Sequence, residues 1–136
     1  MAYWLVKSEP GVWSWAQHAQ KGADAWTGVR NFQARANLRA MKKGDKAFFY
    51  HSNEGKEIVG VTEVVKEAYP DPSAKDGDWS CVDLKALAAL KTPVSLEAIK
   101  ADKALADMVL VKNSRLSVQP VTAKEWAHIT KLGGLK

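Results

Sequence analysis

The chain of 136 residues lacks several signatures that would point to familiar chemistry. Its single cysteine, Cys81, cannot form an internal disulfide, and its histidines, His18, His51 and His128, are too scattered to match metal-ligand spacing. It has no glycine-rich phosphate loop, no Gly-x-Ser-x-Gly elbow and no compelling pair of carboxylates. We therefore predict no metal and no cofactor, and nothing in the sequence demands an enzyme.

Long apolar runs are also missing. No segment is long enough to span a bilayer, and residues 1–8 lack the basic and apolar regions of a secretory signal. These absences predict a soluble, cytoplasmic protein without membrane contact.

The composition is that of an ordinary folded domain. Hydrophobic residues make up 46% of the chain and charged residues 26%, and there is no repeat, linker or low-complexity stretch. A length of 136 residues suits one core. We predict a single domain over residues 1–136 and assume a monomer, although the sequence does not fix the oligomeric state.

The predicted strands do not alternate regularly with helices. The run of residues 47–51 is continuously apolar and aromatic before His51, as expected of a strand buried on both sides, and should form a hairpin with residues 57–66. Gly60 indicates a bulge or a close backbone approach, and Pro120 favours an edge strand. Further strands are predicted at residues 2–7, within 79–90 and at 116–121. This pattern predicts an α+β fold, a small mixed barrel rather than a Rossmann fold.

Helix boundaries are marked by capping signals. Ser14 with Gln17 and Thr122 with Glu125 form capping boxes, the second opening a terminal helix, while Ser95 should cap a short helix. Residues 31–41 form a further predicted helix, capped by Asn31. On it, Ala34, Leu38 and Met41 form a core stripe, whereas Arg35, Arg39 and Lys42 share an outward face.

Positive charge is concentrated near the N-terminus. Residues 1–52 carry eight Lys or Arg against three acids, whereas the remaining residues carry twelve of each sign. Arg30, Arg35 and Arg39 lie within ten residues, and a patch of this kind suits phosphate binding. A solvated helix face would give the same pattern.

Of the six tryptophans, Trp26 differs from Trp4, Trp15 and Trp126 because it lies in a predicted loop. Trp4, Trp15 and Trp126 fall on predicted strands or helices and are expected in the core. Trp26 precedes Arg30 and Asn31 closely, and an aromatic ring beside guanidinium and amide groups is suited to stacking a base and bonding its edge.

Two further polar clusters flank the predicted strands. Tyr50, His51 and Ser52 end one strand, with His51 equally open to a structural role as a hydrogen-bonded side chain. Alternation places Tyr50 and Ser52 on one face and Phe49 and His51 on the other. Residues 7–10 and 114–117 are weaker signals, each also consistent with an ordinary surface charge.

Four stretches together resemble the EVE family: Tyr3 to Pro10, Trp26 to Arg35, Phe48 to Ser52 and Ser114 to Val121. EVE domains are PUA-like relatives of YTH and ASCH modules. The resemblance implies a small twisted β-barrel of five or six strands flanked by helices. It also implies binding of a nucleic acid, DNA or RNA, that carries a modified base such as a modified cytosine.

The resemblance further implies a set of site residues. The base-binding pocket would comprise Lys7, Ser8, Trp26, Val29, Arg30, Asn31, Tyr50, His51, Ser52, Ser114, Arg115, Leu116 and Ser117. The basic patch, and not the resemblance, predicts that the phosphates are held by Arg30, Arg35, Arg39 and Lys42.

Three functions remain open on these residues. The first is a non-catalytic reader that extrudes one base into an aromatic pocket. The second is an amidohydrolase for modified nucleosides, as in some ASCH-type relatives, in which Lys7 and Glu9 would be the catalytic pair. The third is a protein-interaction domain, whose binding would be indifferent to salt.

Overall fold

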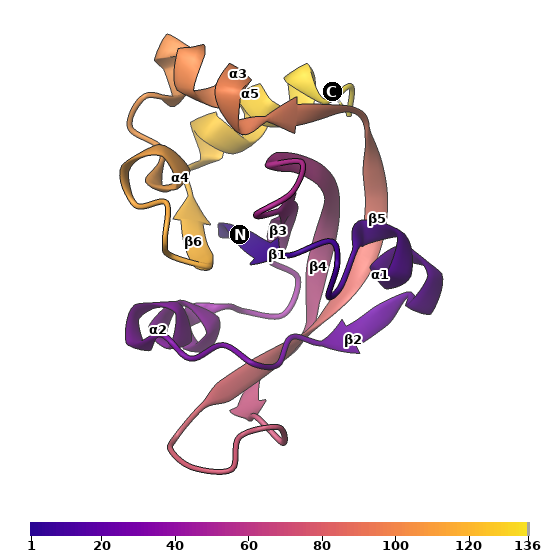
Figure 1. Ribbon diagram of the computed structural model, residues 1–136, viewed down its shortest axis with the longest axis vertical. Coiled ribbons are helices and arrows are strands. Elements are labelled where there is room, and N and C mark those ends of the chain that lie inside the picture. The colour runs from indigo at the N-terminus through magenta and orange to yellow at the C-terminus, as the bar shows by residue number, and fades with distance from the viewer. Residues whose placement is uncertain (136) are drawn as a thin grey trace.

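The computed structural model describes residues 1–135, which form one mixed sheet with helices on both sides (Figure 1). The strands are β1 (Tyr3–Ser8), β2 (Ala23–Ala25), β3 (Lys46–His51), β4 (Glu57–Pro70), β5 (Ser80–Ser95) and β6 (Val118–Val121). The α-helices are α1 (Trp15–Lys21), α2 (Phe32–Ala40), α3 (Leu96–Ala101), α4 (Val109–Lys112) and α5 (Ala123–Leu132), with a 3-10 turn at Lys103–Leu105. The predicted α+β class is confirmed.

The sheet has the strand order β2-β5-β4-β3-β1-β6. All neighbours are antiparallel except β1 and β3, which run parallel. Within residues 1–135 no backbone pairing joins β2 to β6, so hydrogen bonds do not close the sheet into a ring. Closure of the barrel stays a prediction.

Two long strands bend the sheet. The predicted hairpin of β3 and β4 is confirmed, with a register shift between Phe49 and Tyr50 opposite Gly60. A Cβ on Gly60 would lie 2.6 Å from the ring of Trp15, so the expected close approach at this glycine is also confirmed. Both strands are longer than predicted: β4 runs on to Pro70 and β5 to Ser95.

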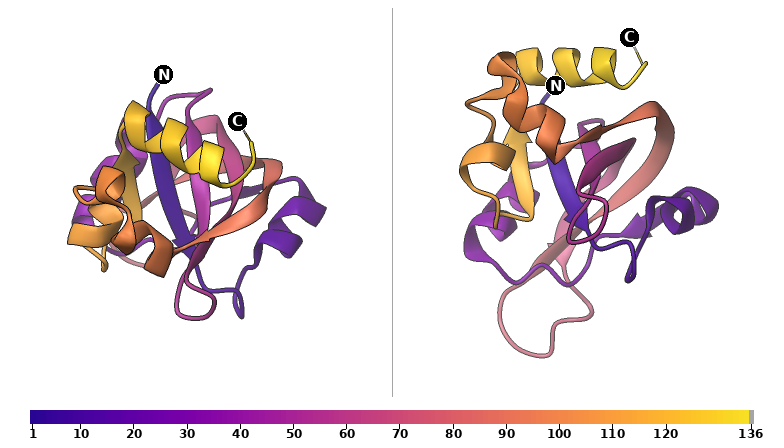
Figure 2. Two further views of the ribbon diagram at one scale, coloured as in Figure 1. Left: turned by 90° about the horizontal axis from the view of Figure 1, so that it is seen from above. Right: turned by 45° about the horizontal axis from the view of Figure 1, so that its top comes forward.

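The core consists of two layers, one on each face of the sheet. On β3, Phe49 belongs to the layer packed against α2, whereas Phe48 and Tyr50 belong to the layer packed against α3, α4 and α5. The two views of Figure 2 show the terminal helix α5 crossing the sheet on the side opposite α2. Because β3 is buried on both faces, its continuous apolar pattern is explained.

The capping predictions are confirmed. Ser14 and Thr122 close capping boxes on α1 and α5, and Asn31 and Ser95 accept bonds at the starts of α2 and α3. β6, which contains Pro120, is an edge strand as expected. The short strand β2 was not predicted, because three residues with mixed burial carry too little pattern. None of the helices described is long and apolar enough to cross a membrane.

Candidate functional site

A cavity of about 350 Å³ opens where the end of β1 meets the segment between β2 and α2. Its volume lies in the range of about 300–1,000 Å³ that is typical of small-molecule sites. We call it the first cavity, and its lining residues are Lys7, Ser8, Trp13, Asp24, Ala25, Trp26, Thr27, Gly28, Val29, Arg30 and Ser117.

Two indoles contribute to the walls of the first cavity. Trp26 is only 8% exposed, and its ring meets Phe49 edge to face at 5.4 Å and 86°. Trp13 is half-buried; its indole Nε1 donates to His18 Nδ1 at 3.4 Å, and its carbonyl accepts a 2.6 Å bond from Ser8 Oγ. Both residues are therefore held by contacts within the protein.

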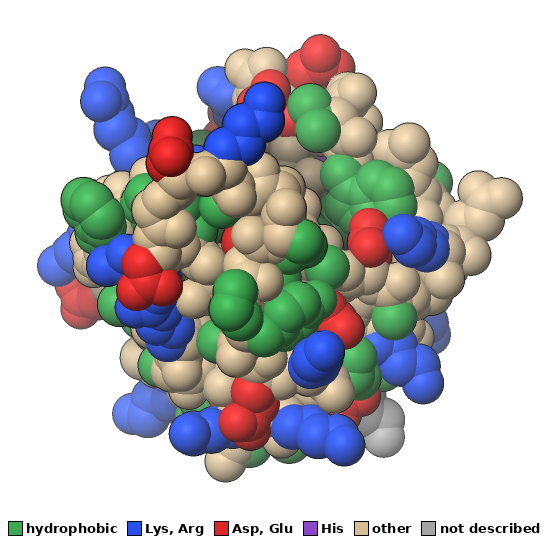
Figure 3. All heavy atoms as spheres, turned by 90° about the horizontal axis from the view of Figure 1, so that it is seen from below, with side chains coloured by type: hydrophobic (Ala, Val, Ile, Leu, Met, Phe, Trp, Pro, Cys, Tyr) green, Lys and Arg blue, Asp and Glu red, His purple; other side chains and the backbone are tan. Residues whose placement is uncertain are grey.

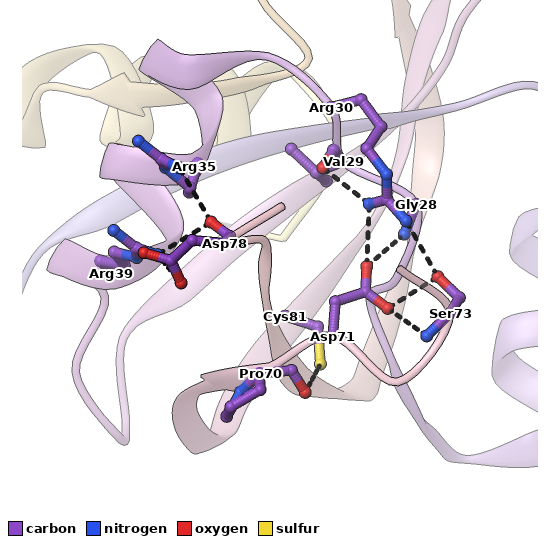
Figure 4. A network of polar contacts seen from close by, with 10 residues as sticks. All are labelled: Gly28, Val29, Arg30, Arg35, Arg39, Pro70, Asp71, Ser73, Asp78 and Cys81. Carbon is purple, nitrogen blue, oxygen red and sulfur yellow. Dashed lines mark hydrogen bonds and ion pairs between the residues drawn. The ribbon is translucent and has the colours of Figure 1, made fainter. Parts of the chain in front are cut away.

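The carboxylate of Asp71, which is far from Trp26 in the sequence, holds the segment after Trp26 in place. Asp71 Oδ2 accepts from the backbone N–H of Gly28 at 2.9 Å and from Arg30 Nη1 at 3.0 Å, while Asp71 Oδ1 accepts from Ser73 (Figure 4). Gly28 has φ +85°, a conformation that side-chain-bearing residues rarely adopt. The loop between β4 and β5 thus determines where Arg30 lies.

The environment of Asp71 favours its charged form. Burial alone would raise the pKa of this carboxyl, but the hydrogen bonds from Ser73, Gly28 and Arg30 outweigh that effect and lower the pKa to about 2. Asp71 is therefore a fixed negative charge that neutralises part of the charge of Arg30.

A second cavity, of about 280 Å³, adjoins the first at Lys7, which lines both. The lining residues of the second cavity are Lys7, Tyr50, Ser52, Asn53, Lys56, Leu96, Lys100, Leu110 and Ser114. Lys7 Nζ donates to the carbonyl oxygen of Ser114 and lies 5.7 Å from the centre of the Tyr50 ring. Burial lowers the pKa of Lys7 and raises that of Tyr50. Three lysines make this second cavity basic.

Comparison with known proteins identifies the family. The EVE domain model matches residues 2–132, almost the whole chain. The chain belongs to the EVE family. It is 41% identical to mouse thymocyte nuclear protein 1, over 96% of this chain and 73% of the mouse protein.

Several solved structures share the fold. A Rhodopseudomonas palustris protein is 62% identical with a TM-score of 0.94, over 99% of this chain and 94% of its own. Human THYN1, solved in complex with DNA containing 5-methylcytosine, is 36% identical with a TM-score of 0.89, over 98% of each chain. A YTH domain from Zygosaccharomyces rouxii is 19% identical with a TM-score of 0.60, over 97% of this chain and 86% of its own, and shows the fold alone.

The site residues implied by the EVE resemblance are divided between the two cavities. Lys7, Ser8, Trp26, Val29, Arg30 and Ser117 line the first cavity, and Lys7, Tyr50, Ser52 and Ser114 line the second. The expected single pocket containing Trp26 and Tyr50 is thus two adjoining cavities, because the two side chains pack on opposite faces of the sheet.

The remaining implied residues line neither cavity. Asn31 accepts from the N–H of Ala34 at 2.9 Å as the cap of α2, and His51 Nε2 accepts from the N–H of Trp15 at 3.0 Å. Leu116 is 2% exposed in the core, and Arg115 is exposed outside both cavities. For His51 the alternative structural role fits the geometry.

The predicted phosphate-binding arginines contact the loop between β4 and β5. Arg35 and Arg39 both donate to the carbonyl oxygen of Asp78, and Arg39 also pairs with the Asp78 carboxylate at 2.9 Å (Figure 4). Lys42 is exposed beyond the end of α2. The basic face is therefore outward, as expected, but acidic residues offset part of its charge.

Sequence reasoning missed several residues of this region, among them Trp13, Asp24 and Asp71. Trp13 and Asp24 line the first cavity, and Asp71 holds its wall. Trp13 shares with Trp26 the one signal that was available, a tryptophan outside any predicted helix or strand. Asp24 and Asp71 carry no local signal, because their roles depend on contacts made by folding.

The alternative catalytic pair is separated. Lys7 lines both cavities, whereas Glu9 is exposed in the turn after β1 and lines neither; its carboxylate accepts from Asn53 Nδ2 at 3.4 Å. Strand alternation would have placed Lys7 and Glu9 on one face, but β1 ends at Ser8.

Among residues 1–135, no three His, Cys, Asp or Glu side chains converge as metal ligands.

Proposed function

We propose that this EVE protein is a non-catalytic reader that holds one modified base in the first cavity. Family membership and the human THYN1 complex with DNA containing 5-methylcytosine support a nucleic acid as the partner. The observation that carries the proposal is a cavity of about 350 Å³ with the indoles of Trp13 and Trp26 in its walls.

The cavity offers complementary chemistry for a base. Trp13 and Trp26 supply aromatic surface for stacking, which contributes about 1–3 kcal/mol per base. The Asp24 carboxylate is positioned by Lys21 Nζ and by the N–H of Ala25, each at 2.9 Å. A carboxylate is the acceptor that suits an exocyclic amino group, so a modified cytosine fits this wall.

The cationic side chains around the two cavities, which we call the cationic rim, can bind the phosphate backbone of the nucleic acid. Arg30 and Lys7 lie at the first cavity, and Lys56 and Lys100 line the second. Phosphates on one side of the extruded base would meet Arg30 and Arg35, and those on the other side the lysines of the second cavity. The partner is then DNA or RNA with the modified base flipped out.

Equilibrium binding to oligonucleotides tests the proposal. We expect wild-type protein to bind DNA with one 5-methylcytosine more tightly than the same DNA with cytosine. The Trp13→Ala variant should lose most of this binding, whereas Val12→Ala, at a neighbour that is 74% exposed, should keep it. Absence of binding to both DNAs, and to DNA or RNA with other modified bases, would overturn the proposal.

Hydrolysis of acylated cytidines is the second candidate, favoured by the lowered pKa of Lys7 between the two cavities. Incubation with acylated cytidine followed by chromatography decides between binding and turnover. Product formation that Lys7→Ala abolishes would establish it, and no turnover would remove it. We place either activity in the cytoplasm.

A further inference from the structure

An aromatic platform lies beside the first cavity, built from Phe32 at the start of α2 and Trp79 before β5. The two rings are stacked, with centroids 5.3 Å apart and planes 16° apart. Phe32 is 69% exposed, a high value for an aromatic side chain, whereas Trp79 is half-buried. Stacking on Trp79 therefore holds an exposed ring in a fixed orientation.

Two arginines frame this platform. The guanidinium of Arg35 lies 4.9 Å from the centre of the Phe32 ring and 5.3 Å from that of Trp79. The guanidinium of Arg30 lies 5.6 Å from the Trp79 ring. Arg30 and Arg39 pair with the carboxylates of Asp71 and Asp78. Arg35 forms no ion pair within residues 1–135, and its guanidinium donates to the carbonyl oxygen of Asp78. A positive charge therefore remains at the platform.

Arg30 connects the platform to the first cavity, because it lines the cavity and contacts Trp79. Figure 3 shows the end of the molecule that carries the loop between β4 and β5, where hydrophobic side chains gather among charged side chains of both signs. An exposed ring beside the Arg35 guanidinium, next to a base-sized cavity, suits the neighbouring nucleotide of the same strand. Its base has a π face and its phosphate a negative charge.

We propose that the Phe32 platform is a second subsite, which stacks the unpaired base next to the modified base. This inference rests on the proposed function and deepens it. The first cavity would select the modification, while the platform would contribute affinity without base selectivity, since every base offers a face for stacking. A stack of this kind changes affinity about 5- to 100-fold.

A set of single-stranded trinucleotides tests the subsite. Each carries a central 5-methylcytosine. The intact trinucleotide has both flanking bases, and the others are abasic at the 5′ position, at the 3′ position or at both. With wild-type protein, removing one particular flanking base should weaken binding about 5- to 100-fold. Phe32→Ala should cause the same loss on the intact trinucleotide and no further loss once that base is absent.

Further variants separate stacking from general effects. Phe32→Tyr keeps the ring and should bind like wild type, whereas Phe32→Leu should behave like Phe32→Ala. Leu87→Ala, at an exposed leucine on β5, should have no effect. Circular dichroism checks that the variants fold. Substitution of Phe32, an exposed residue at the start of α2, should not disturb folding.

Two results would overturn the inference, and they differ. If Phe32→Ala and loss of either flanking base leave affinity unchanged while the doubly abasic trinucleotide still binds, the platform is refuted and the reader function stands. If wild-type protein binds none of the trinucleotides, and none of the matching DNA or RNA trinucleotides with another modified base at the centre, both the subsite and the proposed function fail.

Discussion

Asp71 and Arg30 are 41 residues apart in the sequence, yet they meet at 3.0 Å, and the same carboxylate holds the N–H of Gly28. The side chain of Asp71 is fully buried, whereas that of Arg30 is 38% exposed. Asp71 therefore positions the cavity wall and leaves the guanidinium accessible to a ligand.

The variant Asp71→Asn should lower the free energy of unfolding by about 2 kcal/mol at pH 7, because charge-assisted hydrogen bonds are lost. The pKa of Asp71 is about 2 in the folded chain against an ordinary value of 3.8. Its contribution is therefore present above about pH 4 and is lost as the pH falls through about 2. Urea denaturation at several pH values measures the difference between variant and wild type.

The matched control is Asp76→Asn, at an exposed position of the same loop, which should unfold like wild type. The stability gap of Asp71→Asn should narrow between pH 4 and pH 2. Equal stability of the two variants at pH 7 would contradict the role given to Asp71.

At the scale of single residues, the sequence predicts contacts between neighbours in the chain but not contacts between residues far apart. Trp26 and Arg30 could be assigned to the site because aromatic and guanidinium groups lie close together in the sequence. Asp71 could not, because its role arises only when the loop after β4 packs on the segment after β2. Trp26 and Tyr50 were assigned to one pocket because the sequence does not show which layer each ring enters.

At the scale of elements, two histidines attach α1 and the turn before it to the sheet. His51 Nε2 accepts from the N–H of Trp15 at 3.0 Å, and His18 Nε2 lies 3.0 Å from Thr62 Oγ1. The Thr62 hydroxyl donates to the carbonyl of Lys85, so His18 Nε2 is the donor and its Nδ1 accepts from Trp13. Both rings must be neutral for these bonds.

We expect the free energy of unfolding to fall as the pH is lowered from 7.5 to 5.5. Burial lowers the pKa of both His18 and His51, opposed by Asp24 and Glu57 respectively. As the pH falls, the histidines of the unfolded chain therefore take up protons before those of the folded chain. The stability that the two neutral histidines contribute is complete above about pH 6.5 and is lost as the pH falls from there toward the pKa values of the folded state. Denaturation at both pH values measures the effect, and NMR titration follows each ring. Either histidine titrating at or above pH 6.5 would contradict the assignment.

Elements with local signals were predicted well. The capping residues of α1, α2, α3 and α5 lie within three residues of the N–H groups they bond, so the sequence contains the whole interaction. The parallel pairing of β1 with β3, and the placement of β6 beside β1, depend on residues far apart in the chain. No local pattern specifies them.

At the scale of the whole molecule, the net charge of +5 and the cationic rim predict a salt-dependent interaction. Binding of a single-stranded oligonucleotide should weaken as salt rises, with a slope of log affinity against log salt of about −0.7 for each phosphate contacted. Two or three contacts give a slope of about −1.5 to −2.

The matched ligand is the free 5-methylcytidine nucleoside, which has no phosphate and should show almost no slope. Titrations at several salt concentrations measure both ligands. A salt-independent oligonucleotide affinity would contradict phosphate contacts and favour the protein-interaction alternative.

The family resemblance supplied most of the prediction at this scale. Four short stretches spread over the chain indicated the EVE family, which the domain match over residues 2–132 confirms. The sequence alone did not reveal that the implied site residues are divided between two adjoining cavities, both lined by Lys7. That arrangement depends on Trp26 and Tyr50 packing in different core layers, which no local sequence pattern specifies.

The six indole N–H groups offer the most direct measurement of where the base binds. In a proton–nitrogen NMR titration with single-stranded DNA containing 5-methylcytosine, the Trp13 and Trp26 indole signals should shift together. Those of Trp4, bonded to Asp45, and of Trp126, stacked on Phe48, should stay in place. A saturable shift of Trp126 with Trp13 and Trp26 unchanged would contradict base binding in the first cavity.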